Sequence, residues 1–224
     1  MLKPKFEILD KAKNKTIRQL MDDMHMIDKC HMKKGASGLI VENLLGIKNN
    51  NIDDADIPEI GCEIKVLPLQ KNRNGIIKPK EPTAIQLINY CEVSGEHWET
   101  AKIRRKITLT LWIAYLAKEN GLSKSQEDYR IIDYYLERPS EADQAVFKQD
   151  WEFIQNYINL GKADKLSCSM GTYIEPKTKG ANSDDKRDAP DGKGGLPRAR
   201  RRAFYYKKNY TSTRIIPKLD FSEI

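Results

Sequence analysis

Apolar residues recur at helical spacing in three stretches of the chain. Residues from about 9 to 28, 36–45 and 141–160 each place apolar side chains three or four positions apart. That spacing collects the side chains on one face of an α-helix, so each stretch is predicted to form an amphipathic helix. Gly46 and Gly161 directly follow the second and third stretches, where glycine commonly ends a helix.

Shorter runs of apolar and β-branched residues predict strands between and after these helices. The first run begins at Glu63 and continues through Leu69. Further strands are predicted at 84–90, 107–113, 130–136 and 203–206, the last of them aromatic. Residues 70–83 are rich in Lys, Pro and Gly and predict a loop. After Tyr173 the chain is expected to be loop-like as far as the aromatic strand, and a short helix is expected near its end.

Basic charge is concentrated in one segment. The 224-residue chain has a formal net charge of +7, and residues 175–208 contain eleven Lys or Arg against five Asp or Glu, a net +6. No amphipathic basic helix is visible, so a nucleic acid is favoured over a membrane surface as the polyanionic partner. Arg200, Arg201 and Arg202 are expected to contact DNA phosphates. The alternatives are a solvated basic face and a disordered insert.

Cysteine and histidine usage argues against a zinc site. The four cysteines, Cys30, Cys62, Cys91 and Cys168, are dispersed without a CxxC pair, and the three histidines add no ligand spacing. Dispersed free cysteines favour a reducing compartment. The N-terminus lacks the apolar run of a signal peptide, and no segment approaches about 18 consecutive apolar residues. A cytoplasmic protein is therefore expected.

Candidate catalytic residues lie at the first predicted strand. Asp56 is followed seven residues later by Glu63, and Lys65 comes two residues after that. Alternate side chains of a strand project from the same face, so Glu63 and Lys65 should lie side by side. Two carboxylates and an ammonium suit metal-assisted hydrolysis of a phosphodiester, with Mg²⁺ held by the acids and the attacking water steadied by the lysine. The alternative is an ordinary half-exposed strand with a charge pair.

One more acid lies within the predicted helix at 36–45. Glu42 has Leu39 and Leu45 as its neighbours at i−3 and i+3, which places it on the apolar stripe. A carboxylate in such a position is costly unless it is paired or binds a metal. Glu42 is therefore a candidate ligand.

Six short motifs occur in a fixed order along residues 12–215. They are Lys34-Gly35 with the following helix to Glu42; Asp56, Glu63 and Lys65; Gly-Glu-His-Trp-Glu-Thr at 95–100 with basic residues to Lys106; Asp150-Trp-Glu152; Lys179-Gly-Ala-Asn182; and the Phe204–Ser212 segment. In this combination the chain resembles the MutH-like endonucleases. That family joins the mismatch-repair strand-nicking enzyme to type II restriction enzymes that cut at GATC.

The resemblance implies the fold of the PD-(D/E)xK nucleases. That fold is of the α/β class, with a mixed central sheet flanked by helices, in two lobes around a DNA cleft. The family spaces its Asp and Glu by seven, as this chain does at Asp56 and Glu63. A single MutH-like endonuclease domain over residues 1–224 is expected, with a basic recognition loop at about 175–203.

The resemblance also implies roles for individual residues. Asp56 and Glu63 would be Mg²⁺ ligands, Lys65 the group that orients water, and Glu42 a supporting acid. The residues expected to contact DNA are Lys34 and Lys106 near the scissile phosphate, Lys177, Lys179 and Tyr205 at the recognition site, and Lys207 in the C-terminal motif. Lys177 stands where the mismatch-repair enzyme carries an arginine.

Three activities are consistent with the resemblance. The favoured one is a Mg²⁺-dependent type II restriction endonuclease acting on double-stranded DNA at GATC, because the long region between Trp112 and Asp150 and the Lys-Gly-Ala-Asn motif resemble the restriction enzymes. A single active site would cut both strands by pairing with a second copy on DNA or by acting twice. The alternatives are a strand-nicking endonuclease working with mismatch-repair proteins, and a non-catalytic DNA-binding domain of a larger restriction enzyme. The intact Asp-Glu-Lys set argues against the last.

Overall fold

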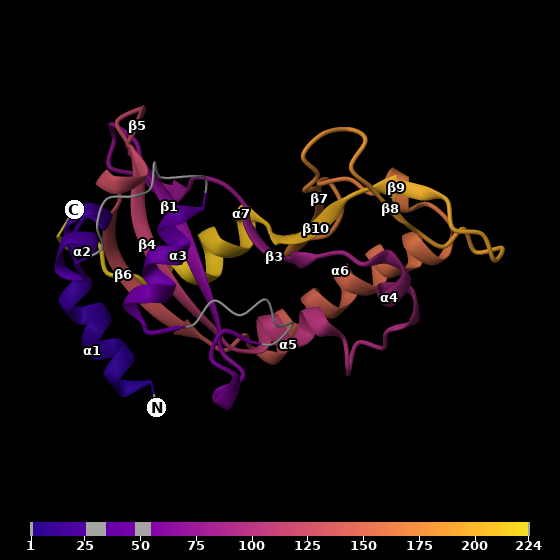
Figure 1. Ribbon diagram of the computed structural model, residues 1–224, viewed down its shortest axis with the longest axis horizontal. Helices are drawn as coiled ribbons and strands as arrows, with labels where there is room; N and C mark the ends of the chain where they lie inside the picture. The colour runs from indigo at the N-terminus through magenta and orange to yellow at the C-terminus, as the bar shows by residue number, and fades with distance from the viewer. Residues whose placement is uncertain (1, 26–34, 48–54, 224) are drawn as a thin grey trace. The chain divides into compact units, whose positions relative to one another are not determined.

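The computed structural model describes residues 2–25, 35–47 and 55–223 (Figure 1). The chain divides into two compact units. The first comprises Met1–Glu81, Leu109–Glu137 and Ser212–Ile224, and the second Pro82–Thr108 and Arg138–Thr211. Neither unit is one continuous stretch of sequence. The predicted single endonuclease domain and its DNA cleft remain predictions.

The first unit is built on a mixed sheet with the order β2-β1-β4-β5, in which β6 also pairs with β4. Its strands are β1 (Glu63–Lys71), β2 (Ile77–Pro79), β4 (Thr110–Glu119), β5 (Leu122–Ser123) and β6 (Arg130–Glu137). Strand β1 runs parallel to β4, and the other pairs are antiparallel. The first eight residues of β4 are all buried, so β4 is the centre of this unit.

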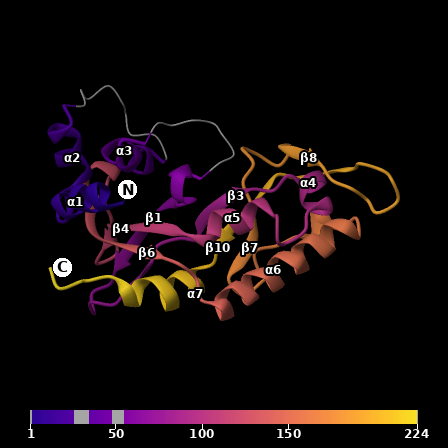
Figure 2. The same ribbon diagram turned by 90° about the horizontal axis from the view of Figure 1, so that it is seen from below.

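Three helices cover one face of this sheet (Figure 2). They are α1 (Lys3–Ala12), α2 (Ile17–Asp23) and α3 (Ala36–Leu44). Their buried residues, among them Leu9, Ile17 and Ile40, join Ile64 and Leu111 of the sheet in one hydrophobic core. The mixed sheet flanked by helices confirms the predicted fold class.

The second unit has a three-stranded antiparallel sheet and a two-stranded ribbon. The sheet has the order β3-β10-β7, with bounds Thr83–Leu87, Arg202–Tyr206 and Ile174–Thr178, and the ribbon pairs β8 (Lys186–Asp188) with β9 (Arg198–Arg200). The helices are α4 (Tyr90–Gly95), α5 (Lys102–Thr108), α6 (Glu141–Asn159) and α7 (Lys208–Tyr210).

Single turns of tighter or wider helix occur in both units, at Pro58–Ile60, Gln126–Asp128, Ala163–Lys165, Thr211–Ile215 and Ile216–Lys218.

The predicted helix at 9–28 is wrong as a single element. The chain forms α1 and α2 instead, and Thr16 begins α2 with a capping box in which its side chain and that of Gln19 accept each other's main-chain N–H. Asn14 has φ of 63°, a left-handed conformation that interrupts the helix. The helix at 36–45 is confirmed as α3, and Gly46 follows it with φ of 67°.

The predicted strands agree in part with the structure. Those at 130–136 and 203–206 are confirmed as β6 and β10, as is the helix at 141–160 as α6. The strand at 84–90 ends at Leu87, because Asn89 caps α4. The strand expected from 107 begins only at Thr110, since Ile107 belongs to α5. The loop expected after Tyr173 is wrong: β7, β8 and β9 all lie there.

Of the residues that the structure describes, none lies in a helix long and apolar enough to cross a membrane.

A buried carboxylate joins α6 to β7 in the second unit. Asp150 is almost fully buried, and its two oxygens accept the main-chain N–H groups of Thr172, Tyr173 and Ile174 at 2.7, 2.6 and 2.9 Å. These three bonds satisfy donors that burial would otherwise leave unpaired. Asp150 therefore fixes where β7 begins.

Replacing Asp150 with Asn should lower the free energy of unfolding by roughly 2–4 kcal/mol, because an amide NH₂ group then faces main-chain donors. Urea denaturation followed by circular dichroism measures this. Glu152→Gln is the matched control, since Glu152 is exposed on the same helix and makes only a surface ion pair of 3.7 Å with Lys148. The control should change stability by less than about 0.5 kcal/mol. Equal effects of the two changes would contradict this role of Asp150.

Candidate active site and nucleic-acid interface

The N-terminal half of β1 offers its main-chain groups to two different partners. The N–H of Glu63 donates to the Leu109 carbonyl at 2.9 Å, beside β4. Successive N–H groups of a strand point to opposite edges, so the N–H of Ile64 points away from β4. There the Asp56 carboxylate accepts it at 2.8 Å. Among the described strands, β2 pairs only with the far end of β1, at Leu69–Lys71, which leaves this edge to Asp56.

A tight turn explains the spacing of the two acids. Ile57 and Cys62 pair with each other through main-chain bonds of 2.9 and 3.1 Å. The turn between them contains Pro58–Ile60 and ends at Gly61, whose φ of 63° suits glycine. The six intervening residues are thus taken up in a closed turn. Asp56 is thereby returned to the start of β1.

Glu63 and Lys65 lie side by side on one face of β1, as predicted. The Lys65 ammonium is 2.7 Å from Oε1 of Glu63. Glu63 is 3% exposed and the Lys65 side chain 13%, so this is a largely buried ion pair. A surface charge pair, the alternative considered from sequence, does not describe it. Burying such charges is costly unless they are paired, and the ion pair between Glu63 and Lys65 offsets part of that cost.

Glu42, near the C-terminal end of α3, lies close to the same three residues. Burial raises the pKa of its half-buried carboxyl, as do the charges of Asp56 and Glu63, while Lys65 opposes the rise. All three neighbours act on Glu42 electrostatically, so the structure brings the four predicted catalytic residues together. Leu39 is 42% exposed, so Glu42 lies at the border of the apolar stripe and not within it.

The donor set suits a hard divalent cation that keeps part of its water shell. Among the residues that the structure describes, no three or more Asp, Glu, His and Cys side chains are grouped so that they could hold a metal ion together. Mg²⁺ is usually held by one or two carboxylates with waters and substrate phosphates. Each carboxylate can accept several bonds, so those from Ile64 and Lys65 leave Asp56 and Glu63 chemically competent as ligands. The residues present therefore fit Mg²⁺.

In the second unit, three of the predicted DNA-contacting residues form one cluster. Lys177 lies opposite Ala203, and Tyr205 lies two residues beyond on the same face of β10. The ammonium groups of Lys177 and Lys179 are 5.6 and 5.3 Å from the centre of the Tyr205 ring. Both lysines are thus within cation–π distance of a single aromatic ring.

The arginine triplet does not act as one basic face. Arg200 is exposed, whereas the half-buried Arg201 contacts Asp185 at 3.4 Å. Arg202 is 7% exposed and donates to the carbonyls of Pro176 and Asp164 at 3.3 and 3.5 Å. Neighbouring strand residues point to opposite faces, so Arg202 is directed into the protein. Its expected contact with DNA phosphates is therefore replaced by a structural role.

The other predicted cations have separate positions. Lys106 is half-buried in the last turn of α5. Lys207 is half-buried and donates to the Gly171 carbonyl at 2.8 Å, which ties down the loop before β7. Lys34 lies outside the described residues.

Sequence reasoning missed the acids that organise these cations. Glu175 is buried on the same face as Lys177; burial raises its pKa, and Lys177 and Lys207 oppose the rise. Asp185 contacts both Arg187 at 2.7 Å and Arg201. The alternation Glu-x-Lys-x-Lys at 175–179 could have placed Glu175 beside the two lysines, because alternate side chains of a strand share one face.

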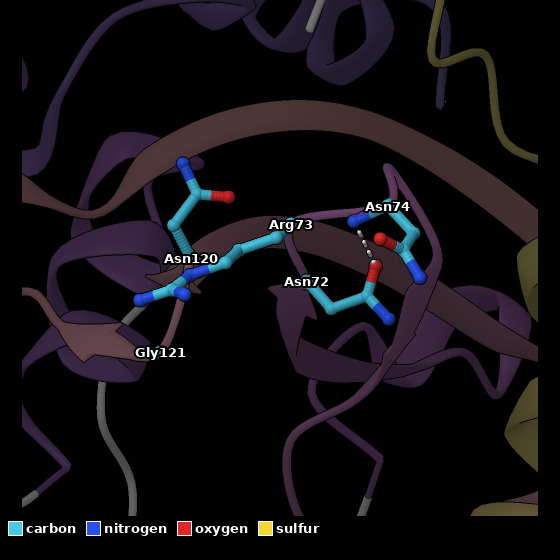
Figure 3. A pocket seen from close by; sticks show the side chains of 5 residues that line it. All are labelled: Asn72, Arg73, Asn74, Asn120 and Gly121. Carbon is cyan, nitrogen blue, oxygen red and sulfur yellow. Dashed lines mark hydrogen bonds between the residues drawn. The ribbon is translucent and has the colours of Figure 1, made fainter.

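A hollow at the other end of β1 is a separate feature (Figure 3). It is open, has a volume of about 380 Å³, and is lined by Asn72, Arg73 and Asn74 and by the Asn120-Gly121 turn. Oδ1 of Asn72 accepts the main-chain N–H groups of Asn74 and Ile76, so this side chain shapes its own turn. Strand β1 is nine residues long, which places the hollow roughly 25 Å from Glu63. It is not part of the candidate active site.

Comparison with known proteins identifies the family of this chain. The family model described as "DNA mismatch repair enzyme MutH" matches residues 45–150, which include Asp56, Glu63 and Lys65. DNA mismatch repair protein MutH of Shewanella woodyi is 30% identical over 200 residues, which are 88% of this chain and 84% of that protein. The chain belongs to the MutH-like endonuclease family. The resemblance inferred from the six motifs is thereby confirmed.

Other members of the MutH-like family differ in length. The type II restriction enzyme Sau3AI of Staphylococcus aureus is 33% identical over 180 residues, which are 80% of this chain and 36% of that enzyme. MutH of Pasteurella multocida is 29% identical over 196 residues, 87% of this chain and 85% of that protein. This chain thus spans about a third of the restriction enzyme but most of each MutH.

Replacing Glu42 with Gln should raise the free energy of unfolding of the metal-free protein at neutral pH. A raised carboxyl pKa means that folding disfavours the charged form, so the penalty is present above that pKa and absent below the ordinary value of 4.5. The gain should therefore shrink as the pH falls towards 4.5. Urea denaturation with a chelator present at both pH values measures it.

Glu59→Gln is the control for that change, because Glu59 is exposed in the neighbouring turn at Pro58–Ile60 and its loss should change the free energy of unfolding little. A loss of stability in Glu42→Gln at neutral pH would mean that the Glu42 charge is favourable in the folded protein.

Proposed function

We propose that the chain is a Mg²⁺-dependent type II restriction endonuclease that hydrolyses phosphodiester bonds in double-stranded DNA at GATC. The observation that carries the proposal is the convergence of Asp56, Glu63, Lys65 and Glu42 around the open edge of β1. Such a set of acids beside an ammonium suits metal-assisted hydrolysis of a phosphodiester. The proposal places the enzyme in the cytoplasm, where its dispersed cysteines stay reduced.

Asp56 and Glu63 would hold the Mg²⁺ ion. Once bound, Mg²⁺ makes a coordinated water more acidic and offsets the negative charge that develops on the phosphate. The protein fixes both ligands before substrate arrives: Ile64 N–H orients the Asp56 carboxylate, and Lys65 orients that of Glu63. Such preorganisation avoids a reorganisation cost at the moment of reaction.

Lys65 would position the attacking water and stabilise the phosphate oxygens. Its ammonium is held by Glu63 at 2.7 Å and is largely shielded from solvent, so its field is less screened than that of a surface lysine. Glu42 would support the same water from the α3 side. The oxygen of the water would form the new bond to phosphorus while its proton passes to solvent or to Glu42, and the bond from phosphorus to the 3′-oxygen would break, with a solvent water protonating that oxygen.

Recognition of GATC would fall to the cluster on β7 and β10. Lys177 and Lys179 can donate to guanine O6 and N7 in the major groove. The ring of Tyr205 attracts both ammonium groups, which limits the directions in which they can donate. Lys106 and, outside the described residues, Lys34 would contact phosphates near the scissile bond. Cutting of both strands would involve a second copy of the chain on DNA or two successive events.

The second candidate is a strand-nicking mismatch-repair endonuclease at GATC. It is favoured by one observation: the chain covers 84% of MutH of Shewanella woodyi but 36% of Sau3AI. Under this alternative, mismatch-repair proteins would be partners. The restriction activity is preferred because of the long region between Trp112 and Asp150 and the Lys-Gly-Ala-Asn motif at 179–182. A non-catalytic DNA-binding domain would have no use for a buried Glu63–Lys65 pair.

Asp56→Ala and Lys65→Ala should each lower the rate of DNA cleavage by about 10²-fold or more, because each removes a preorganised group at the reacting phosphate. Plasmid cleavage with Mg²⁺ measures the rate, and a gel-shift assay with a chelator tests whether DNA binding persists. Lys71→Ala is the control, since Lys71 ends the same strand about 25 Å away. Near-normal cutting by Lys65→Ala would remove Lys65 from the mechanism.

Plasmid with unmethylated, hemimethylated or fully methylated GATC sites should distinguish the two endonuclease functions. Double-strand breaks that map to GATC, formed without accessory proteins, are the expected result. Weak nicking of the unmethylated strand alone, stimulated by mismatch-repair proteins, would support the second candidate. Fragments with random ends would contradict GATC recognition, and no Mg²⁺-dependent cleavage of any plasmid would favour a binding module.

A further inference from the structure

The ribbon of β8 and β9 is a fixed platform beside the recognition cluster. Ala199 in β9 and Ala189 just after β8 are buried, and the Arg200 carbonyl accepts a hydrogen bond from the Tyr90 hydroxyl. At the end of α6, a Cβ atom on Gly161 would lie 2.5 Å from the Asp191 carbonyl, so the turn of the ribbon fits closely there. Strand β9 leads through one residue into β10, and Lys179 donates its N–H to the Arg201 carbonyl at 3.0 Å.

Two like charges lie directly opposite each other on this ribbon. Lys186 of β8 pairs in register with Arg200 of β9, so both side chains leave the same face. Cβ atoms at such positions are about 5 Å apart, and like charges there are destabilising. An anion held between the two side chains would offset this cost.

The other arginines of the ribbon have acidic partners. Arg198 is 3.7 Å from Asp188, its register partner, and Arg187 is 2.7 Å from Asp185. Within the part of the chain that the structure describes, neither Lys186 nor Arg200 forms an ion pair. The Asp164 carboxylate accepts the main-chain N–H of Arg200 at 3.4 Å, which is a bond to the backbone and not to the guanidinium.

We infer that Lys186 and Arg200 together clamp one backbone phosphate of duplex DNA flanking the recognition sequence. This inference rests on the proposed function, because it requires DNA to lie against the β7–β10 cluster. A guanidinium fork matches phosphate oxygens in two bonds, and a lysine adds a point charge beside it. The clamp reads no base, so it contributes affinity and position and leaves sequence discrimination to the cluster of Lys177, Lys179 and Tyr205.

The inference is tested with Lys186→Gln, Arg200→Gln and the double variant in the full chain. Binding is measured by fluorescence anisotropy in a chelator on duplexes of about 30 bp, with and without GATC, from about 50 to 200 mM salt. The double variant should bind both duplexes about tenfold more weakly, with a salt slope lower by about one, the value for one phosphate contact. Its ratio of GATC to non-GATC affinity should stay at the wild-type value.

Arg198→Gln is the matched control, because Arg198 lies on the same ribbon face but is paired with Asp188. It should stay within about twofold of wild type, since its charge is already partly neutralised. Arg200→Lys keeps the charge but lacks the guanidinium fork, so it should lose less DNA affinity than Arg200→Gln. Retained binding by Arg200→Lys would also show that the ribbon still folds when this side chain is changed.

Three outcomes would overturn the clamp. They are a double variant with wild-type affinity and salt slope, an equal loss in Arg198→Gln, and a loss confined to the GATC duplex. Failure of the proposed function is a distinct result, because the wild-type chain would then fail to cleave DNA with Mg²⁺.

Discussion

The geometry of the candidate active site depends on how a β-strand alternates. At the start of β1, one N–H bonds to β4 and the next is accepted by Asp56, while Glu63 and Lys65 share a face because they are two residues apart. The strand thus places Glu63 and Lys65 through its own alternation, and its free N–H holds Asp56, which the closed turn at Ile57–Cys62 returns to the same point. A strand anchored in a buried sheet is a more rigid support than a loop, which suits a site whose groups must be preorganised.

Both units use a carboxylate, half-buried in the first and buried in the second, to fix the beginning of a strand. Asp56 binds a main-chain N–H of β1 in the first unit, and Asp150 binds the N–H of Ile174, the first residue of β7, in the second. A carboxylate that accepts main-chain donors is a strong and directional partner. Strands β1 and β7, which carry proposed functional side chains, are therefore each located by a charged hydrogen bond as well as by apolar packing.

Local patterns in the sequence were enough to predict the Glu63–Lys65 pair, since it depends only on strand alternation. The Thr16-x-x-Gln19 capping box was also readable, and it would have divided the first helix correctly. By contrast, β7 contains Pro176, Glu175 and Lys177, and it is a strand only because β10 pairs with it. The burial of Arg202 follows from that same distant pairing, so no local pattern in the arginine triplet could reveal it.

The parallel pairing of β1 with β4 also shapes how the protein can fold. The segment Pro82–Thr108, which connects these two strands, belongs to the second unit. Contacts between residues far apart in sequence form slowly, because the intervening chain loses conformational entropy when its ends meet. Here that intervening chain is itself part of another folded body. Pairing of β1 with β4 therefore closes a loop whose residues belong to the second unit, so the entropy lost on pairing depends on whether that segment is already ordered.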